Sequence, residues 1–180
     1  MNDTKLLTYE DFLTFPDDGV RREILEGELF VSPSPVLRHQ DVAGLIYVSL
    51  HNHIKANGGG RTFIAPLDVL LGKHDIVEPD VIFVADDRLG ILHEKHLIGA
   101  PTLLVEVVSD SRTDRVRKRN VYARAGVPTY WVADPDSDRV EVYRLHGISY
   151  AKPDILEPGE TLTLDELPGL RIELAELFQR

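Results

Sequence analysis

PTLLVEVVSDS, residues 101–111, is the stretch that decides the fold expected for this chain. Successive side chains of a strand point to opposite faces, so an uninterrupted apolar run of this length predicts a strand buried on both faces. One face carries only apolar residues, Leu103, Val105 and Val107. The opposite face includes an acid, Glu106, among its apolar residues.

A carboxylate at Glu106 needs a partner. Carrying an unpaired charge into an apolar interior is strongly unfavourable, so the group has to be neutralised by a proton, a cation or a metal ion. The sequence therefore predicts a polar site built around this acid.

Length and composition bound the class of protein. The 180 residues with 43% apolar content suit a single domain over residues 1–180 with a sizeable core. There is no cysteine, which excludes disulfides and thiolate metal sites. The beginning MNDTKLLTYEDF lacks the layout of a signal peptide, and no apolar run approaches the ~20 residues that cross a bilayer. We expect a cytoplasmic protein with no membrane partner.

The formal net charge of −10 argues against nucleic acid as a partner, because phosphate binding relies on lysine and arginine. The stretch RTDRVRKRNVYAR, residues 112–124, is the local exception, with five arginines and one lysine against one aspartate. It is either a basic binding stripe or simply the solvated face of a helix.

Periodicity and turn residues predict the elements around this centre. We expect a short helix capped by Thr8 and ended by Pro16, a hairpin turning at Glu26-Gly27, and a long helix. The long helix spans residues 39–57, and the basic helix spans about 112–125. Strands are expected over residues 61–71, 79–85, 102–109, 128–134 and 139–145, and a closing helix over residues 171–178. This order of elements predicts an α/β (α+β) fold with a mixed central sheet flanked by helices.

Two further residues are candidates to meet Glu106. Asp80 follows Pro79 at the start of a strand, so two carboxylates on neighbouring strands would converge where a divalent cation relieves their repulsion. Lys118 lies on the basic helix directly after the Glu106 strand. Each residue also has a purely structural interpretation. Asp80 could simply belong to a turn at EPD, residues 78–80. Lys118 could pair with Asp114 on the same helix and stabilise it by only ~0.3 kcal/mol.

Several blocks occur in an order that resembles the Uma-two family of bacterial proteins, a branch of the restriction-endonuclease-like superfamily. The blocks are EPDVIFV, GAPTLLVEVVS, DRVRKRNVYARAGVPTYWVADP, PGETL and LPGLRIELAELF. The resemblance extends from about Glu23 to Phe178. It implies a restriction-endonuclease-like core with an N-terminal hairpin.

The superfamily carries a proline-aspartate on one strand and a glutamate-x-lysine on the next, which together hold a metal ion and activate water. The resemblance assigns these acids to Asp80 and Glu106, with the backbone carbonyl of Val107 as a further ligand. Val108 occupies the lysine position, which departs from the parent pattern. Lys118 on the following helix is the residue that would substitute for the missing lysine.

Glu23 matches a further block of the family, REILEGELF, and is expected to be an additional ligand or catalytic acid; a salt-bridged surface glutamate would show the same pattern. Thr129 stands where the family usually has glutamate, and we interpret this as a surface change or an altered subunit contact.

Histidines offer no zinc pattern. His93 and His96 have helical spacing but lack further ligands beside them. His39, at the beginning of the long helix, is expected either to point into the cleft or to lie at its rim.

These residues lead to a first hypothesis, a Mg²⁺- or Mn²⁺-dependent endonuclease that hydrolyses phosphodiester bonds of DNA and forms a homodimer, as the resemblance implies. The alternative is a catalytically inactive nuclease-fold module that binds nucleic acid or protein, in which arginine pairs with the acids and no divalent ion is taken up. A third hypothesis is a metal-dependent enzyme acting on a small phosphorylated substrate, which the low pI would suit.

Overall fold

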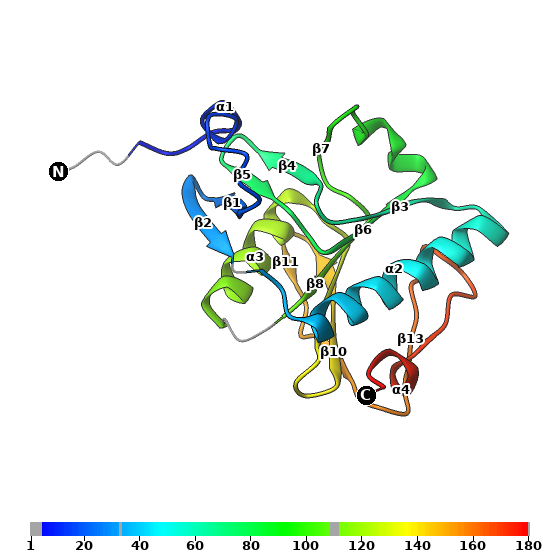
Figure 1. Ribbon diagram of the computed structural model, residues 1–180. Coiled ribbons are helices and arrows are strands. Elements are labelled where there is room, and N and C mark those ends of the chain that lie inside the picture. The colour runs from blue at the N-terminus through cyan, green and yellow to red at the C-terminus, as the bar shows by residue number, and fades with distance from the viewer. Residues whose placement is uncertain (1–4, 33, 109–111, 180) are drawn as a thin grey trace.

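A seven-stranded mixed sheet forms the centre of the computed structural model, which describes residues 5–32, 34–108 and 112–179, with only the backbone of residues 112–114 (Figure 1). The strand order is β11-β10-β9-β8-β6-β3, and β12 also pairs with β10. The bounds are β3 (Gly60–Ile64), β6 (Val81–Ala85), β8 (Leu103–Val107), β9 (Thr129–Asp134), β10 (Arg139–His146), β11 (Ser149–Tyr150) and β12 (Asp154–Leu156). Among the described strands of this sheet, β8 and β9 run parallel and the other pairs run antiparallel. The expected mixed sheet is confirmed.

A second sheet of five strands has the order β2-β1-β5-β4-β7. Its strands are β1 (Arg21–Leu25), β2 (Glu28–Ser32), β4 (Asp68–Gly72), β5 (Asp75–Val77) and β7 (His96–Ile98), and a small pair consists of β13 (Thr161–Leu162) and β14 (Ile172–Glu173). The helices are α1 (Tyr9–Phe12), α2 (Leu37–Asn57), α3 (Arg112–Ala125), α4 (Leu174–Leu177) and the 3₁₀ helix η1 (Asp86–Ile91). None of the helices within the described ranges is both long and apolar enough to span a bilayer.

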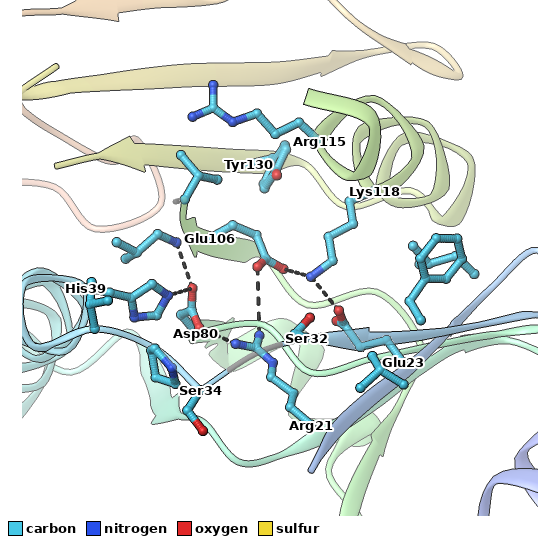
Figure 2. A pocket seen from close by; sticks show the side chains of 17 residues that line it. Arg21, Glu23, Ser32, Ser34, His39, Asp80, Glu106, Arg115, Lys118 and Tyr130 are labelled. Atoms are coloured by element: carbon cyan, nitrogen blue, oxygen red, sulfur yellow. Dashed lines mark hydrogen bonds and ion pairs between the residues drawn. The ribbon is translucent and has the colours of Figure 1, made fainter. Parts of the chain in front are cut away.

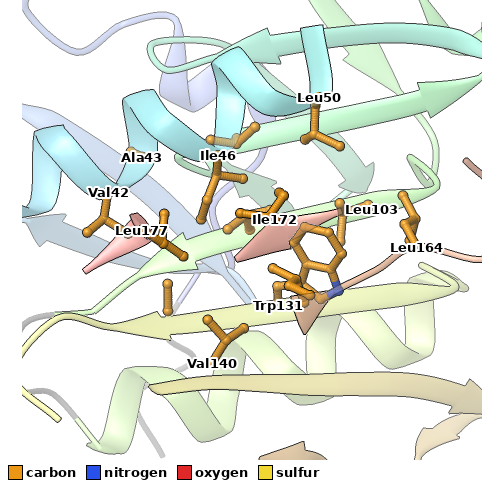
Figure 3. Packing of buried hydrophobic residues seen from close by; sticks show 14 of the residues in the cluster. Val42, Ala43, Ile46, Leu50, Leu103, Trp131, Val140, Leu164, Ile172 and Leu177 are labelled. Carbon is orange, nitrogen blue, oxygen red and sulfur yellow. The ribbon is translucent and has the colours of Figure 1, made fainter. Parts of the chain in front are cut away.

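The apolar face of β8 packs under α2 and the carboxyl-terminal segment (Figure 3). The helix contributes Val42, Ala43, Ile46 and Leu50 to this cluster. The strands contribute Leu103, Val105, Val107, Trp131 and Val140, and the tail contributes Leu164, Ile172, Leu174 and Leu177. The helical spacing of one set and the alternation of the other agree with the periodicities of the sequence.

The other face of the central sheet packs against α3 and β1. Leu104 and Tyr130 of the sheet join one buried cluster with Val121 and Tyr122 of α3 and Leu25 of β1. Glu106 has the same strand parity as Leu104 and so points into this layer. The face that sequence alternation assigned to the acid is therefore the face that α3 and the hairpin cover.

The hairpin and the cap of α1 form as predicted. Glu26 and Gly27 both have positive φ, of 55° and 79°, between β1 and β2, as a tight two-residue turn matching the strand twist requires. Thr8 accepts a hydrogen bond from the backbone of Asp11, whose side chain binds the backbone of Thr8 in return.

Three expectations are wrong. Residues 61–71 form not one strand but two, β3 in the central sheet and β4 in the second sheet, because the chain changes sheets around Pro66. Residues 172–173 form β14, so the closing helix is shorter than expected. Thr129 is not on the surface: it is buried at the start of β9, between Leu103 and Arg144 of the neighbouring strands.

Replacing Leu103 by alanine should lower the free energy of unfolding by about 2–5 kcal/mol, because truncating a fully buried side chain leaves a cavity. Urea denaturation followed by circular dichroism measures the loss. Leu37→Ala, at a residue that is 85% exposed at the start of α2, should change it by less than about 0.5 kcal/mol. Equal losses in the two variants would contradict the assigned core.

Candidate active site

Asp80 and Glu106 meet because their strands are neighbours. β6 and β8 are antiparallel, with Val81 opposite Val105. The next pair outward in this register is Asp80 and Glu106, so both acids lie at the same end of the ladder. Asp80 is 3% exposed and Glu106 is 6% exposed. The predicted convergence of the two carboxylates is present, and it occurs in the interior of the protein.

Two residues of α3 bind Glu106 through the same oxygen. Lys118 donates a hydrogen bond to Oε1 at 3.0 Å, and the hydroxyl of Tyr122 donates to Oε1 at 2.6 Å. The two donors are four residues apart, which places them on one side of the helix. The charge that the sequence left unexplained at Glu106 is thus compensated by an ammonium from the helix that follows its strand.

Lys118 also binds Glu23 of β1. Its Nζ lies 2.8 Å from Oε2 of Glu23, while Oε1 of Glu23 accepts a hydrogen bond from the backbone of Glu78. Glu23 is 2% exposed, so the alternative of a surface glutamate is wrong. The other pairing considered for Lys118, with Asp114, falls outside the described side chains. The ammonium joins the hairpin to the central sheet (Figure 2).

Arg21, two residues before Glu23, is a member of the site that sequence reasoning missed. Its Nη1 donates to Oδ1 of Asp80 at 2.8 Å, and its Nη2 lies 3.9 Å from Oε2 of Glu106. The same nitrogen donates to the backbone carbonyl of Glu78. Figure 2 shows the guanidinium between the two acids.

The second oxygen of Asp80 is held from the opposite side. Oδ2 lies 3.2 Å from Nε2 of His39 and accepts a hydrogen bond of 2.7 Å from the backbone N–H of Val107. His39 belongs to the first turn of α2, so the helix places its imidazole against the acid. Of the two positions considered for His39, the structure has the inward one (Figure 2).

The two acids respond differently to burial. For Asp80, burial opposes ionisation, but the hydrogen bond from His39 and the charge of Arg21 outweigh it, and the pKa is lowered. For Glu106, burial dominates over the favourable charge of Lys118, and the neighbouring acids add to it, so the pKa is raised. Burial would lower the pKa of Lys118, yet Glu106 and Glu23 more than compensate and raise it. The lysine is therefore charged.

A pocket of about 420 Å³ opens beside these residues. Its polar lining includes Arg21, Glu23, His39, Asp80, Glu106 and Lys118. Arg115 of α3 and Tyr130 of β9 complete one wall, and the hydroxyl of Tyr130 is buried without a hydrogen-bond partner among the described residues. An acceptor entering the pocket would find this donor available.

The basic stripe of α3 is largely matched by acids of neighbouring elements. Arg115 lies 3.2 Å from Asp134, and Arg124 lies 2.6 Å from Glu26. Arg117 pairs with Glu28 at 2.5 Å. These contacts do not decide between a basic binding stripe and a solvated helix face. The arginines are paired within the fold, but Arg115 still reaches the pocket.

The site offers oxygen atoms, which are the ligands that a hard divalent ion takes. Asp80 and Glu106 offer carboxylate oxygens, Val107 offers a main-chain carbonyl, and a guanidinium already stands as a cation between the two acids. Within residues 5–32, 34–108 and 112–179, no group of three or more His, Cys, Asp or Glu side chains is assembled as a ligand set. These are the kinds of oxygen donor that Mg²⁺ or Mn²⁺ takes, and Arg21 is the cation that contacts both acids.

One signal in the sequence could have found Arg21. Arg21, Glu23 and Leu25 alternate along one strand, so an inward-facing Glu23 requires Arg21 to share its face. Tyr122 follows Lys118 by four residues and could have been placed on Glu106 by the same helical argument.

The comparisons with known proteins identify the family and the fold. Residues 9–175 match the Uma2 family, described as "Putative restriction endonuclease", and the chain belongs to this family. A solved structure from Anabaena variabilis, titled as a "putative nuclease belonging to DUF820", superposes with a TM-score of 0.81 at 22% identity, covering 96% of this chain and 97% of the other. That similarity establishes a shared fold. No curated protein matches the sequence.

Replacing Lys118 by methionine should lower the free energy of unfolding by about 3–5 kcal/mol, because two buried carboxylates lose their ammonium. Lys55→Met, at an exposed position near the end of α2, should leave stability within about 0.5 kcal/mol. Urea denaturation measures both.

Adding Glu23→Gln to Lys118→Met should restore part of the loss, since it removes one of the uncompensated charges. A double variant that is less stable by the full sum of the two single losses would contradict a direct contact between Lys118 and Glu23.

Proposed function

We propose that this protein is a metal-dependent endonuclease that hydrolyses phosphodiester bonds of DNA. The observation that carries the proposal is that Asp80 directly before β6, Glu106 of β8 and Lys118 of α3 line one pocket. There Lys118 binds Glu106, and Arg21 contacts both acids. These are the residues to which the family resemblance assigns the two acids and the lysine.

The relocated lysine supports the proposal. Val108 stands at the position where the parent pattern has lysine, and it lines the same pocket. Lys118 reaches Glu106 from the following helix, so an ammonium is present beside the acid although the strand does not provide it. A lysine that served only α3 would not need to be buried between two carboxylates.

The residues divide the chemistry between them. Asp80, Glu106 and the carbonyl of Val107 would hold Mg²⁺ or Mn²⁺, which when bound lowers the pKa of a coordinated water and neutralises charge on the phosphate. His39 and the N–H of Val107 hold Asp80 in its ionised form. Lys118 holds Glu106 and offers positive charge where negative charge develops on the substrate.

The polar groups around the acids can orient a phosphate. Arg115 and Tyr130 line the pocket together with Glu106. A guanidinium binds phosphate oxygens with paired hydrogen bonds, and a buried hydroxyl without a partner can supply another. These groups support a phosphodiester as the substrate, and the family description supports DNA.

The second candidate is an inactive module on the same scaffold. The observation that favours it is the contact of Arg21 with both Asp80 and Glu106, because an acid pair neutralised by arginine has less need of a divalent ion. A protein of this kind would bind its partner without hydrolysis. Homodimer formation is part of the proposal in either case, and light scattering of the purified protein tests it.

The proposal predicts that purified protein nicks supercoiled plasmid in Mg²⁺ or Mn²⁺ and not in EDTA. Glu106→Gln and Asp80→Asn should each lower the rate at least about 100-fold, because each removes a negative charge from the metal site. Gel electrophoresis of the plasmid over time measures the rates.

Asp86→Asn, in η1 on the surface, is the matched control and should cut like the wild type. Activity that persists in EDTA, or in Glu106→Gln at the wild-type rate, would exclude this site as its origin. Parallel assays on an oligonucleotide and on a small phosphodiester separate DNA cleavage from action on a small phosphorylated substrate.

A further inference from the structure

We propose that Arg21 is the resident counter-cation of the acids, and that a divalent ion binds by displacing its guanidinium into the adjoining pocket. This inference rests on the proposed function, because it concerns how the same acids come to bind metal. It makes Arg21 a positioning residue that sets the affinity of the site for the ion.

The contacts of Arg21 are uneven. The guanidinium makes one close ion pair, 2.8 Å to Asp80, whereas its nitrogens lie 3.9 Å from Glu106 and 3.7 Å from the carboxylate of Glu78. Its Nε is buried without a hydrogen-bond partner among the described residues. A buried N–H without an acceptor is unfavourable, so the guanidinium bridges the acids without satisfying all its donors.

Lys118 is held differently. Its ammonium makes two close contacts, at 2.8 Å and 3.0 Å, with carboxylates on two different strands. The side chain of Lys118 is 11% exposed, against 20% for Arg21. Of the two cations that neutralise the acids, the arginine has fewer close contacts with carboxylates and a more exposed side chain.

The position of Arg21 in the fold leaves space into which its side chain can move. It is the first residue of β1. This strand pairs with β5 at Ile24, so Arg21 lies beyond the end of that pairing. Its side chain lines the pocket of about 420 Å³. Rotation about the side-chain torsions can therefore move the guanidinium into the pocket while the backbone of the hairpin stays in place.

Charge balance favours the exchange. Glu23, Asp80 and Glu106 face two cations, Lys118 and Arg21, so the buried carboxylates outnumber the positive charges. Exchanging the guanidinium for a divalent ion would balance the three carboxylates. A small ion can also approach Glu106 Oε2 more closely than the 3.9 Å at which the planar guanidinium stands.

Isothermal titration calorimetry with MnCl₂ on the wild type, Arg21→Gln and Arg22→Gln tests the inference. Arg21→Gln should bind Mn²⁺ at least about tenfold more tightly, because the competing positive charge is gone. Arg22→Gln should bind like the wild type, since the neighbouring arginine lies on the opposite face of β1 and pairs with Asp18. Circular dichroism verifies that each variant folds.

Arg21→Lys covers the case in which Arg21→Gln does not fold. A single ammonium cannot bridge the acids as the guanidinium does, so this variant should also bind Mn²⁺ more tightly than the wild type, by about threefold or more. Equal or weaker binding in the folded Arg21 variants would overturn the inference while leaving a wild type that binds Mn²⁺ consistent with the proposed function. Absence of Mn²⁺ binding in the wild type and in every folded variant would overturn both. Binding by the Arg21 variants alone would overturn the inference that the ion displaces the wild-type guanidinium, and would favour the inactive module, in which the arginine keeps the ion out.

Discussion

The contact between Lys118 and Glu106 is the interaction on which the site depends. A carboxylate at the centre of the sheet is tolerated only with a cation beside it, and α3 brings that cation back over the strand it follows. Because the same ammonium binds Glu23, the contact also fixes the hairpin against the central sheet. Buried ion pairs are seldom more stable than apolar residues of the same shape, so this arrangement points to chemistry and not to stability.

Charge within this cluster is arranged asymmetrically. Lys118 and Tyr122 both bind Oε1 of Glu106, and Oε2 faces Arg21. One carboxylate oxygen of Asp80 binds Arg21, and the other contacts His39 of α2. Each acid is thus oriented by close donors on one side, while the guanidinium of Arg21 lies between them. The proposed exchange for a divalent ion would move this side chain and leave the backbone in place.

Local patterns predicted most of the fold and much of the candidate site. Alternation placed Glu106 on the face that α3 covers, and helical spacing located α2 and α3. The change of sheets near Pro66 was missed. The residues before and after Pro66 both have the pattern of a strand, so residues 61–71 were predicted as one strand. Arg21 was missed for another reason: alternation with Glu23 indicates its face of β1, but its acid partners lie more than fifty residues further along the chain.

A crystal soaked in Mn²⁺ and measured at the manganese absorption edge tests the account most directly. The account predicts an anomalous peak between the carboxylates of Asp80 and Glu106, with the Arg21 guanidinium moved into the pocket and Lys118 still on Glu106. Occupied crystals with the metal elsewhere, or soaked crystals in which the guanidinium still joins both acids and no peak lies between them, would contradict it.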